Sequence, residues 1–309
     1  MRPVTLPADS HVHSEWSWDA RAGSMEGSCE RAVELGLPAI AFTEHLDHTA
    51  WTVELEGAHR SEHLAALASP AGLLTPPPFD AVSYLEAIER CRDRFPGLRI
   101  LSGLEVGEPH WHPEAVAAVL AGGRFDRVLG SLHCLPTDGG FTEPPGQYRR
   151  RPPAEVVRHY LAEVVRLVTD TDLFSVLAHV DYPVRHWPTQ RAGPFDAAVF
   201  EDEFRHALRA TAESGKALEI NTRVPSLQST LLRWWRDEGG HAVTFGSDAH
   251  QPAMVAHGFQ EAVAMAEAHG FRPGRGPYDL WTRAARPSLA LPSARQRQRS
   301  RREPTKEQP

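Results

Sequence analysis

The chain has 309 residues, of which 41% are hydrophobic, and a formal net charge of -7 at pH 7. This length suits one α/β barrel, a class that takes about 250 residues before insertions, and no apolar run approaches the ~20 residues that a membrane-spanning helix needs. The acidic charge disfavours a general nucleic-acid-binding protein, which normally carries a basic stripe, and favours a small substrate.

Strand and helix patterns alternate along the chain. Short β-rich segments are predicted at residues 4–13, 37–43, 98–106, 127–133, 174–179, 217–221 and 241–247. Helical patterns lie between and after them, at residues 25–35, 81–94, 113–120, 154–169, 196–214, 226–238 and 252–269. Strand followed by helix, repeated in this way, implies right-handed crossovers and a parallel sheet. Because no phosphate-binding glycine loop is evident, we expect an α/β barrel and not a doubly wound sheet.

Two segments fall outside this alternation. Residues 46–78, which end in Thr-Pro-Pro-Pro, follow the second strand and are expected to form a long insertion that covers the mouth of the barrel. From residue 287 onward the chain is rich in Ser, Pro, Arg and Gln and can bury almost nothing. The sequence therefore predicts a barrel domain over residues 1–286 and a disordered tail over 287–309.

The cysteines indicate a reducing compartment. Cys29, Cys91 and Cys134 are odd in number and widely spaced, which argues against both a disulfide framework and a thiolate zinc site. No basic start followed by an apolar stretch and a small-residue cleavage site suggests export. We therefore expect a cytoplasmic protein without a membrane partner.

Residues that bind metals well end each predicted strand. The stretch HVHSEWSWD, at residues 11–19, places His11 and His13 on the same side of a strand, because side chains alternate. The full set is Asp9, His11 and His13; Glu44 and His45; Glu105; His133; His179 and Asp181; Asn221; and Asp248 and His250. All strand C-termini of a parallel barrel open on one face, so we expect these residues to converge on one cavity.

The chemistry of this set favours metal-dependent phosphoester hydrolysis. Imidazoles and carboxylates without thiolates suit zinc, manganese or iron(II). More than four ligands implies more than one ion, and we expect two or three divalent ions, with Glu105 able to bridge a pair. Such ions bind a phosphate oxygen, lower the pKa of a bridging water and stabilise the leaving alkoxide. A metal-activated hydroxide then needs no serine or cysteine nucleophile.

Seven motifs in order resemble those of the polymerase and histidinol phosphatase (PHP) superfamily, specifically its histidinol-phosphatase branch. The motifs are DSHVHSEWSWD, FTEHLD, GLEVGEPHW, GSLHCLP, LAHVDYP, LEINT and FGSDAHQP. The resemblance implies a distorted (β/α)7 TIM-like barrel with a trinuclear metal site at the strand C-termini. Matched residue by residue, the implied metal ligands are His11, His13, Asp19, His45, Glu105, His133, His179, Asp248 and His250.

The resemblance also implies roles for single residues. Glu105 would bridge two ions, and the expected catalytic residues are Glu105, Asp248 and His250. Arg185 stands where histidinol phosphatases carry a basic residue, and its guanidinium suits a bidentate phosphate contact. Strand alternation, and not the resemblance, places Asp181 on the same side as His179, two residues before it, and Asp181 is expected to hold a ligand imidazole.

We expect a phosphomonoesterase for a small phosphorylated substrate, with L-histidinol phosphate, an intermediate of histidine biosynthesis, as the leading candidate. A PHP-type nuclease or nucleotide phosphatase is one alternative, because other members of the superfamily cleave phosphodiesters, although the acidic charge makes a nucleic-acid partner the weaker expectation. A non-catalytic PHP module is another alternative, and the complete ligand set argues against it. The sequence gives no indication of an oligomeric state.

Overall fold

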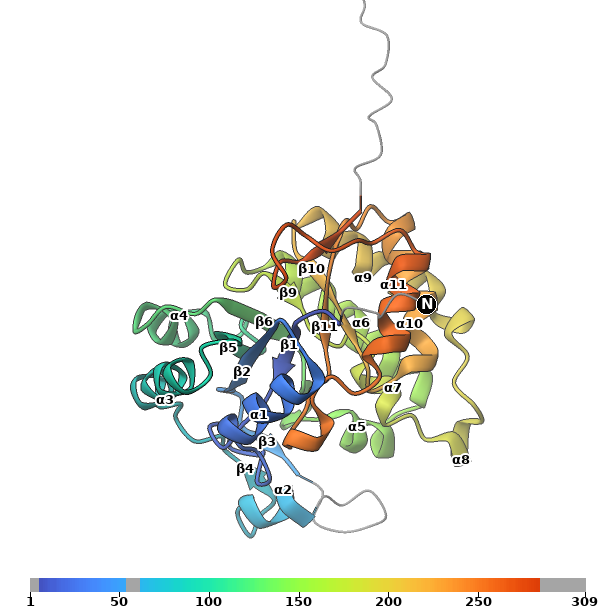
Figure 1. The fold of residues 1–309 in the computed structure, drawn as a ribbon. Coiled ribbons are helices and arrows are strands. Elements are labelled where there is room, and N and C mark those ends of the chain that lie inside the picture. The colour runs from blue at the N-terminus through green and yellow to red at the C-terminus, as the bar shows by residue number, and fades with distance from the viewer. Residues whose placement is uncertain (1–5, 54–61, 284–309) are drawn as a thin grey trace, which may run out of the picture.

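The computed structural model describes residues 6–53 and 62–283 and has a curled sheet at its centre (Figure 1). The strands follow one another in the order β1 (Asp9–Val12), β2 (Ala39–Leu46), β5 (Arg99–Gly107), β6 (Arg127–Ser131), β9 (Val176–Leu177), β10 (Ala217–Asn221), β11 (Ala242–Gly246) and β12 (Trp281–Thr282). All neighbouring strands from β1 to β11 pair in parallel, and β12 pairs antiparallel with β11. The expected α/β barrel with seven parallel strands is confirmed.

The barrel closes at the end where its parallel strands finish. A parallel bridge joins Val12 to Ala249. The backbone N–H of His13 donates to the carbonyl of Ala249 at 2.8 Å, and that of Asp248 donates to the carbonyl of His11 at 2.8 Å. At the other end of β11, Ala242 pairs with β12 instead of β1. The closure is therefore one-sided, which is the distortion expected of this barrel.

Helices cover the outside of the sheet (Figure 1). They are α1 (Met25–Leu35), α3 (Ala81–Arg94), α4 (Pro113–Ala121), α6 (Pro153–Thr169), α9 (Glu201–Glu213), α10 (Pro225–Asp237) and α11 (Phe259–Ala268). In α1, Ser24 caps the first turn by accepting from the backbone of Gly27, and Gly36 ends the helix at a φ of 69°. Within residues 6–53 and 62–283, every helix is too short or too polar to cross a bilayer.

Two helices begin later than their sequence patterns predict. A 3-10 turn at Ala197–Phe200 precedes α9, and a second one at Pro252–Met254 precedes α11. The pattern at 252–269 does not form one helix, because Ala256 and Gly258 have φ values of 54° and 73°, outside the right-handed helical region. Conversely, β2 continues to Leu46, three residues beyond the prediction, so that His45 lies on the strand itself.

Short elements follow the ends of the parallel strands, several of them at the lower edge of the barrel in Figure 1. They are β3 (Trp51–Thr52), α2 (Glu62–Leu67), β4 (Leu73–Leu74), β7 (Leu135–Thr137), β8 (Gly140–Thr142), α5 (Pro144–Arg150), α7 (Tyr182–Arg185) and α8 (Thr189–Ala192). The first three belong to the expected insertion at 46–78. The expected tail at 287–309 lies outside the described residues, and the domain division stays a prediction.

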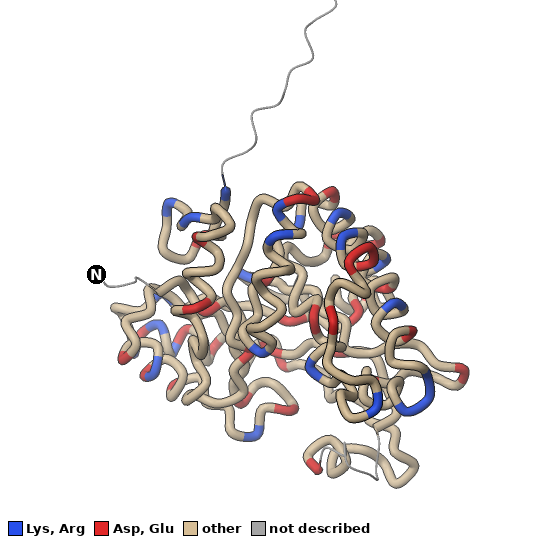
Figure 2. Tube along the Cα trace, turned by 90° about the vertical axis from the view of Figure 1, so that its right-hand side faces the viewer, with Lys and Arg blue, Asp and Glu red and all other residues tan. Residues whose placement is uncertain are grey.

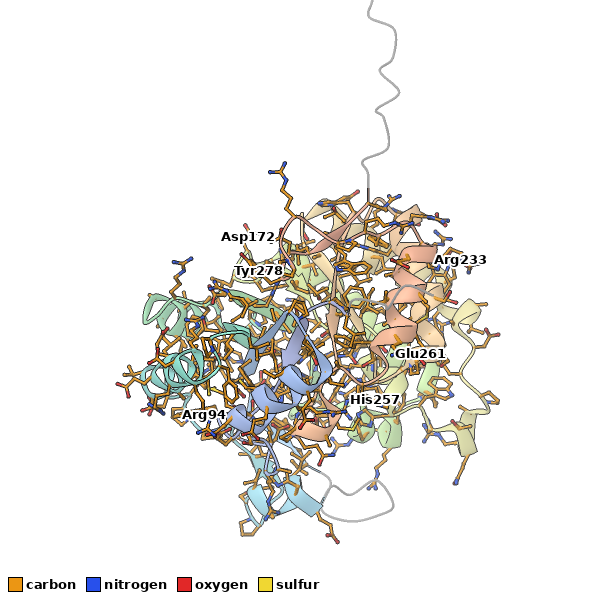
Figure 3. All side chains as sticks on the ribbon, in the orientation of Figure 1. Arg94, Asp172, Arg233, His257, Glu261 and Tyr278 are labelled. Atoms are coloured by element: carbon orange, nitrogen blue, oxygen red, sulfur yellow. The ribbon has the colours of Figure 1, made fainter. Side chains whose placement is uncertain are left out.

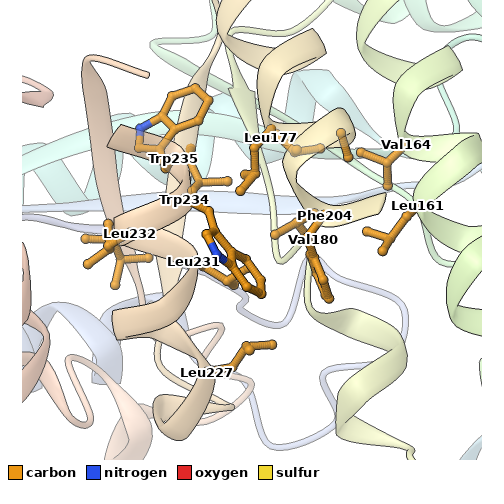
Figure 4. Packing of buried hydrophobic residues seen from close by; sticks show 14 of the residues in the cluster. Leu161, Val164, Leu177, Val180, Phe204, Leu227, Leu231, Leu232, Trp234 and Trp235 are labelled. Carbon is orange, nitrogen blue, oxygen red and sulfur yellow. The ribbon is translucent and has the colours of Figure 1, made fainter. Parts of the chain in front are cut away.

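A large apolar core joins the sheet to α6, α9 and α10 (Figure 4). Leu161 and Val164 of α6 meet Phe204 of α9, Trp234 of α10 and Leu177 of β9, and each is at most 1% exposed. Burial of one such side chain stabilises the fold by about 1.5–3 kcal/mol. This core fixes the positions of strands β9 and β10, and the candidate functional residues lie at the carboxyl ends of these strands.

Asp9 connects β1 to the segment that follows β11. Its buried carboxylate accepts hydrogen bonds from the backbone N–H of Ser247 (3.1 Å), from the Ser247 hydroxyl (2.6 Å) and from the backbone N–H of Ala256 (2.8 Å). Burial raises the pKa of Asp9 to about 6 although these hydrogen bonds lower it. Asp9 therefore stabilises the closure of the barrel and does not join the cluster of potential ligands expected of it.

We predict that Asp9→Ala lowers the free energy of unfolding by more than about 3 kcal/mol. Each hydrogen bond to a charged group contributes ~1.5–3 kcal/mol, and several buried donors would lose their acceptor. Urea unfolding followed by circular dichroism measures the change. The exposed Glu261 on α11 provides the control Glu261→Ala (Figure 3), for which we expect little change. Equal stability of the two variants would contradict the role of Asp9.

Candidate metal centre

The residues that the sequence predicts as metal ligands meet in one cluster. They reach it from the carboxyl ends of six strands and from the loop between β1 and α1. Each of the nine lies within 4 Å of another member, measured between side-chain nitrogen and oxygen atoms; the nine are His11, His13, Asp19, His45, Glu105, His133, His179, Asp248 and His250. The convergence expected from parallel strands is therefore present.

Glu105 lies at the centre of the cluster and is 1% exposed. Its Oε1 atom is 2.5 Å from Nε2 of His179 and 3.2 Å from Nε2 of His133. The Oε2 atom lies 3.2 Å from ring nitrogens of His11 and of His45. Burial acts to raise the pKa of Glu105, but the surrounding imidazoles outweigh it and hold the pKa well below its usual range. The carboxylate thus offers its two oxygens to two different sides of the cluster.

Four groups of three residues have the geometry of metal sites. In each group one ligand atom per residue lies within 4.8 Å of the others; the groups are His13, His45 and His250; His11, Glu105 and His179; His11, His13 and Asp248; and His45, Glu105 and His133. Several residues belong to two groups, so neighbouring ions would share them. The donor set of imidazole nitrogens and carboxylate oxygens suits zinc, manganese or iron(II).

The polar atoms of the cluster need a cation or a proton between them. The Nε2 atoms of His11 and His13, both fully buried, are 3.1 Å apart. Asp19 Oδ1 and His179 Nδ1 are buried without a hydrogen-bond partner among the described residues. A neutral imidazole carries one donor and one acceptor, so rings that turn bare nitrogens toward carboxylates and toward each other are poorly satisfied on their own. Bound divalent ions fit this arrangement.

Asp19 and His250 form the outer side of the cluster. Asp19 Oδ2 is 3.4 Å from Nε2 of His45 and 3.2 Å from Nε2 of His250. Burial acts to raise the pKa of Asp19, and His45 and His250 lower it well below the usual value. Asp19 therefore lies where its carboxylate can act as a metal ligand.

Asp248 links the cluster to Arg185. Its Oδ1 atom is 3.6 Å from Nε2 of His13, and its Oδ2 atom accepts a hydrogen bond from Arg185 at 2.7 Å. The residue has a φ of 54°, which is strained for a side chain other than glycine. Arg223 donates to its carbonyl at 2.8 Å. Burial acts to raise the pKa of Asp248, but Arg185 and His11 hold it well below the usual range.

Glu219 holds two ligand candidates from behind and was not predicted. Its Oε1 atom is 2.6 Å from Nδ1 of His11, and its Oε2 atom accepts from the backbone N–H of His179 at 2.8 Å. A Cβ atom at Gly246 would lie 1.9 Å from Glu219 Oε1, so this strand position requires glycine. The available signal was the LEINT motif, where strand alternation places Glu219 on the same side as Asn221.

Asp181 differs from the expectation. Its carboxylate accepts a hydrogen bond from Gln228 at 3.3 Å and, within the described part of the chain, contacts no imidazole. Burial raises its pKa to about 6, although Arg185 lowers it. Asp181 begins α7, where the chain has left the strand, so the alternation assumed from His179 no longer applies. The imidazole-holding role falls to Glu219.

Two further carboxylates orient histidine rings. Asp47 contacts the Nδ1 atom of a ring directly, and Glu44 acts through Ser17. Glu44 accepts from the Ser17 hydroxyl at 2.6 Å, and Ser17 lies 2.9 Å from Nδ1 of His13. Glu44 thus has a structural role and is no ligand candidate. Asp47 Oδ1 lies 3.3 Å from Nδ1 of His133. Partners of this kind fix the orientation of ligand rings.

A cavity of about 1070 Å³ opens directly beside the cluster. Its walls combine metal-ligand candidates with residues of the insertion and of the segments around α5, α7 and α8, among them Trp51, Leu64, Tyr182, Arg185 and Trp187. The insertion therefore contributes part of the wall. The volume and the mixed lining suit a small, polar organic ligand.

Residues 9–223 match the family model of the PHP domain, and the chain belongs to this family. A probable histidinol-phosphatase of Thermotoga maritima is 31% identical over 262 residues, which cover 82% of this chain and 89% of the relative. A histidinol-phosphatase of Lactococcus lactis is 28% identical over 250 residues, with 78% of this chain and 83% of the relative covered. The family expected from the motifs is confirmed.

A solved structure shares the fold. The histidinol phosphate phosphatase of Lactococcus lactis, in complex with zinc, L-histidinol and phosphate, aligns with a TM-score of 0.70 at 22% identity. The alignment covers 89% of this chain and 98% of that chain. The barrel described above is therefore the architecture of known PHP-type phosphatases.

We predict that the protein purifies with two or three divalent transition ions per chain. His11→Ala combined with His13→Ala should lower both metal content and hydrolysis, because this pair takes part in three of the four ligand groups. Elemental analysis by mass spectrometry measures the content. His257→Ala, an exposed histidine before α11 (Figure 3), should keep the metal. Full activity of a protein that holds only trace metal would refute this prediction.

A second prediction concerns the charge of Glu105. Glu105→Gln keeps the shape but removes the negative charge between cations, and we expect turnover to fall more than about a hundredfold. The assay uses saturating metal and compares Glu261→Gln, which should match the native protein. Turnover of Glu105→Gln within a few fold of the native value would rule out a bridging role.

Proposed function

We propose that this protein is a metal-dependent phosphomonoesterase that hydrolyses L-histidinol phosphate to L-histidinol and phosphate. The observation that carries the proposal is the buried set of histidines around Glu105, beside a cavity in which Arg185 presents donors that have no partner among the described residues. The relatives named histidinol-phosphatases and the zinc, histidinol and phosphate complex of the structural neighbour support it.

We assign the nine clustered residues as the ligands of two or three ions, with Glu105 as the bridging carboxylate. When bound, such ions polarise the phosphate and lower the pKa of a coordinated water. Glu105 and Asp248 remain ionised, because their pKa values lie well below the usual range. Asp248 also orients Arg185, and His250 is the ligand candidate most open to the cavity. These positions support Glu105, Asp248 and His250 as the catalytic residues.

Arg185 has the features of a phosphate-binding residue. One guanidinium nitrogen donates to Asp248 at 2.7 Å, and the guanidinium packs 5.3 Å from the centre of the Tyr182 ring. Its Nε and Nη2 atoms are buried without a hydrogen-bond partner among the described residues. Leaving buried donors unpaired is costly, and a phosphate monoester has the free oxygens to accept from both. Arg185 is therefore the residue we assign to the phosphate.

The alternative functions have weaker support. Lys and Arg alternate with Asp and Glu along the outer helices, with no continuous basic stripe in the view of Figure 2. A nuclease would gain from such a stripe, because phosphate contacts dominate nucleic-acid affinity. A non-catalytic module has no need for a full set of buried ligand candidates.

All three cysteines are free and buried, which supports the cytoplasmic location that we propose.

We predict that Arg185→Ala lowers kcat/KM for L-histidinol phosphate about ten- to hundredfold, the effect of losing a charge-assisted contact. The control is Arg233→Ala, an exposed arginine on α10 (Figure 3), which should not change it. A panel of L-histidinol phosphate, nucleoside monophosphates, sugar phosphates and a short single-stranded oligonucleotide, assayed with zinc and manganese, measures substrate preference. If the oligonucleotide is the best substrate and Arg185→Ala has no effect, the nuclease function replaces this one.

A further inference from the structure

Glu143 places a carboxylate on the cavity wall outside the metal cluster. It precedes α5 and accepts a hydrogen bond from the Tyr182 hydroxyl at 3.0 Å. Within residues 6–53 and 62–283, no Arg, Lys or His forms an ion pair with it. A carboxylate in a partly buried position without a cation is costly, and one that faces a cavity can obtain its partner from a ligand.

The other acidic residues of the described cavity wall already have imidazole or guanidinium partners. Asp19 contacts His45 and His250, and Asp47 contacts His133. Glu105 is surrounded by imidazoles, and Asp248 is paired with Arg185. Each of these four belongs to the metal cluster or supports it. Glu143 is therefore the one carboxylate on the described cavity wall that has no imidazole or guanidinium partner.

Tyr182 fixes the position of Glu143 relative to the reaction centre. The centre of its ring lies 5.4 Å from that of His133 and 5.2 Å from that of His179, and Arg185 packs over the same ring at 5.3 Å. The hydroxyl at the far end of the ring holds Glu143. Tyr182 thus contacts the metal cluster and Arg185 with its ring and Glu143 with its hydroxyl, and all of these groups line the same cavity.

We propose that Glu143 binds the ammonium group of the substrate and thereby selects phosphomonoesters of amino alcohols. This inference rests on the proposed function. In L-histidinol phosphate the ammonium is attached to the carbon next to the ester-bearing carbon, so it lies close to the phosphate. An imidazole has a pKa near 6.5 and is largely neutral at pH 7, whereas an alkylammonium carries a full charge. The ammonium is therefore the better partner for a carboxylate, and Tyr182 serves as a positioning residue.

Burial also affects the charge of Glu143. Burial raises its pKa above the usual value, while the Tyr182 hydroxyl and His133 lower it. A bound ammonium would stabilise the ionised form, as an opposite charge at short distance does. The ionised carboxylate therefore stabilises the bound ammonium, and the ammonium stabilises the ionised form of the carboxylate.

The test compares two substrates that differ in the amine alone. They are L-histidinol phosphate and its deaminated analogue, 3-(imidazol-4-yl)propyl phosphate. We expect the native protein to prefer the aminated ester, and Glu143→Gln to lower the ratio of the two kcat/KM values about ten- to hundredfold. The loss should appear mainly in KM. Glu261→Gln is the control that should leave the ratio unchanged, and metal content and thermal unfolding confirm that each variant is folded.

Two results would overturn the inference. One is an equal loss on both esters in Glu143→Gln, which indicates a structural role for Glu143, and the other is no loss on either ester. If the native protein hydrolyses neither ester, the proposed function is wrong, and calorimetric titration with L-histidinol and with the deaminated alcohol tests the site separately. A preference for L-histidinol that disappears in Glu143→Gln then supports an ammonium site, and no preference in the native protein refutes it.

Discussion

The structure depends on one electrostatic constraint, the burial of many ligand groups around Glu105. Imidazoles from β1, β2 and the ends of β6 and β9 approach a single carboxylate that water does not reach. Such a set is unstable without cations, because bare nitrogen and oxygen atoms face one another in a low dielectric. The low pKa of Glu105 follows from the same packing. Metal binding, charge and fold are therefore coupled at this residue.

The rest of the barrel keeps these groups in position. Glu219 and Asp47 bind the Nδ1 atoms of ligand histidines, so the Nε2 atoms turn inward. Asp9 joins β1 to the segment after β11, which brings His13 beside Asp248. The glycine at 246 leaves room for the carboxylate of Glu219. Residues that never touch a substrate thus decide the geometry of the site.

The residues that line the cavity favour one orientation of a substrate at the metal cluster. Arg185 pairs with Asp248 of the metal cluster and also presents buried donors, so the cluster and the proposed phosphate site share one ion pair. Tyr182 lies against both and ends at Glu143. A substrate that carries a phosphate at one end and a positive charge nearby matches this order of groups.

The sequence by itself determined the seven strand and helix repeats and the convergence of strand-end residues, because strand alternation and the common direction of parallel strand ends are local or topological properties. The ordered motifs indicated the family, and the resemblance implied the nine ligand candidates. Tertiary structure alone decided what each carboxylate contacts. Asp9 accepts a hydrogen bond from Ser247, and Asp181 accepts one from Gln228. Glu219, and not Asp181, contacts the imidazole of His11. The contact between Glu143 and Tyr182 likewise appears only when the segments of α5 and α7 are packed together. Hydrogen-bond partners distant in sequence depend on side-chain directions after packing, which a motif does not encode.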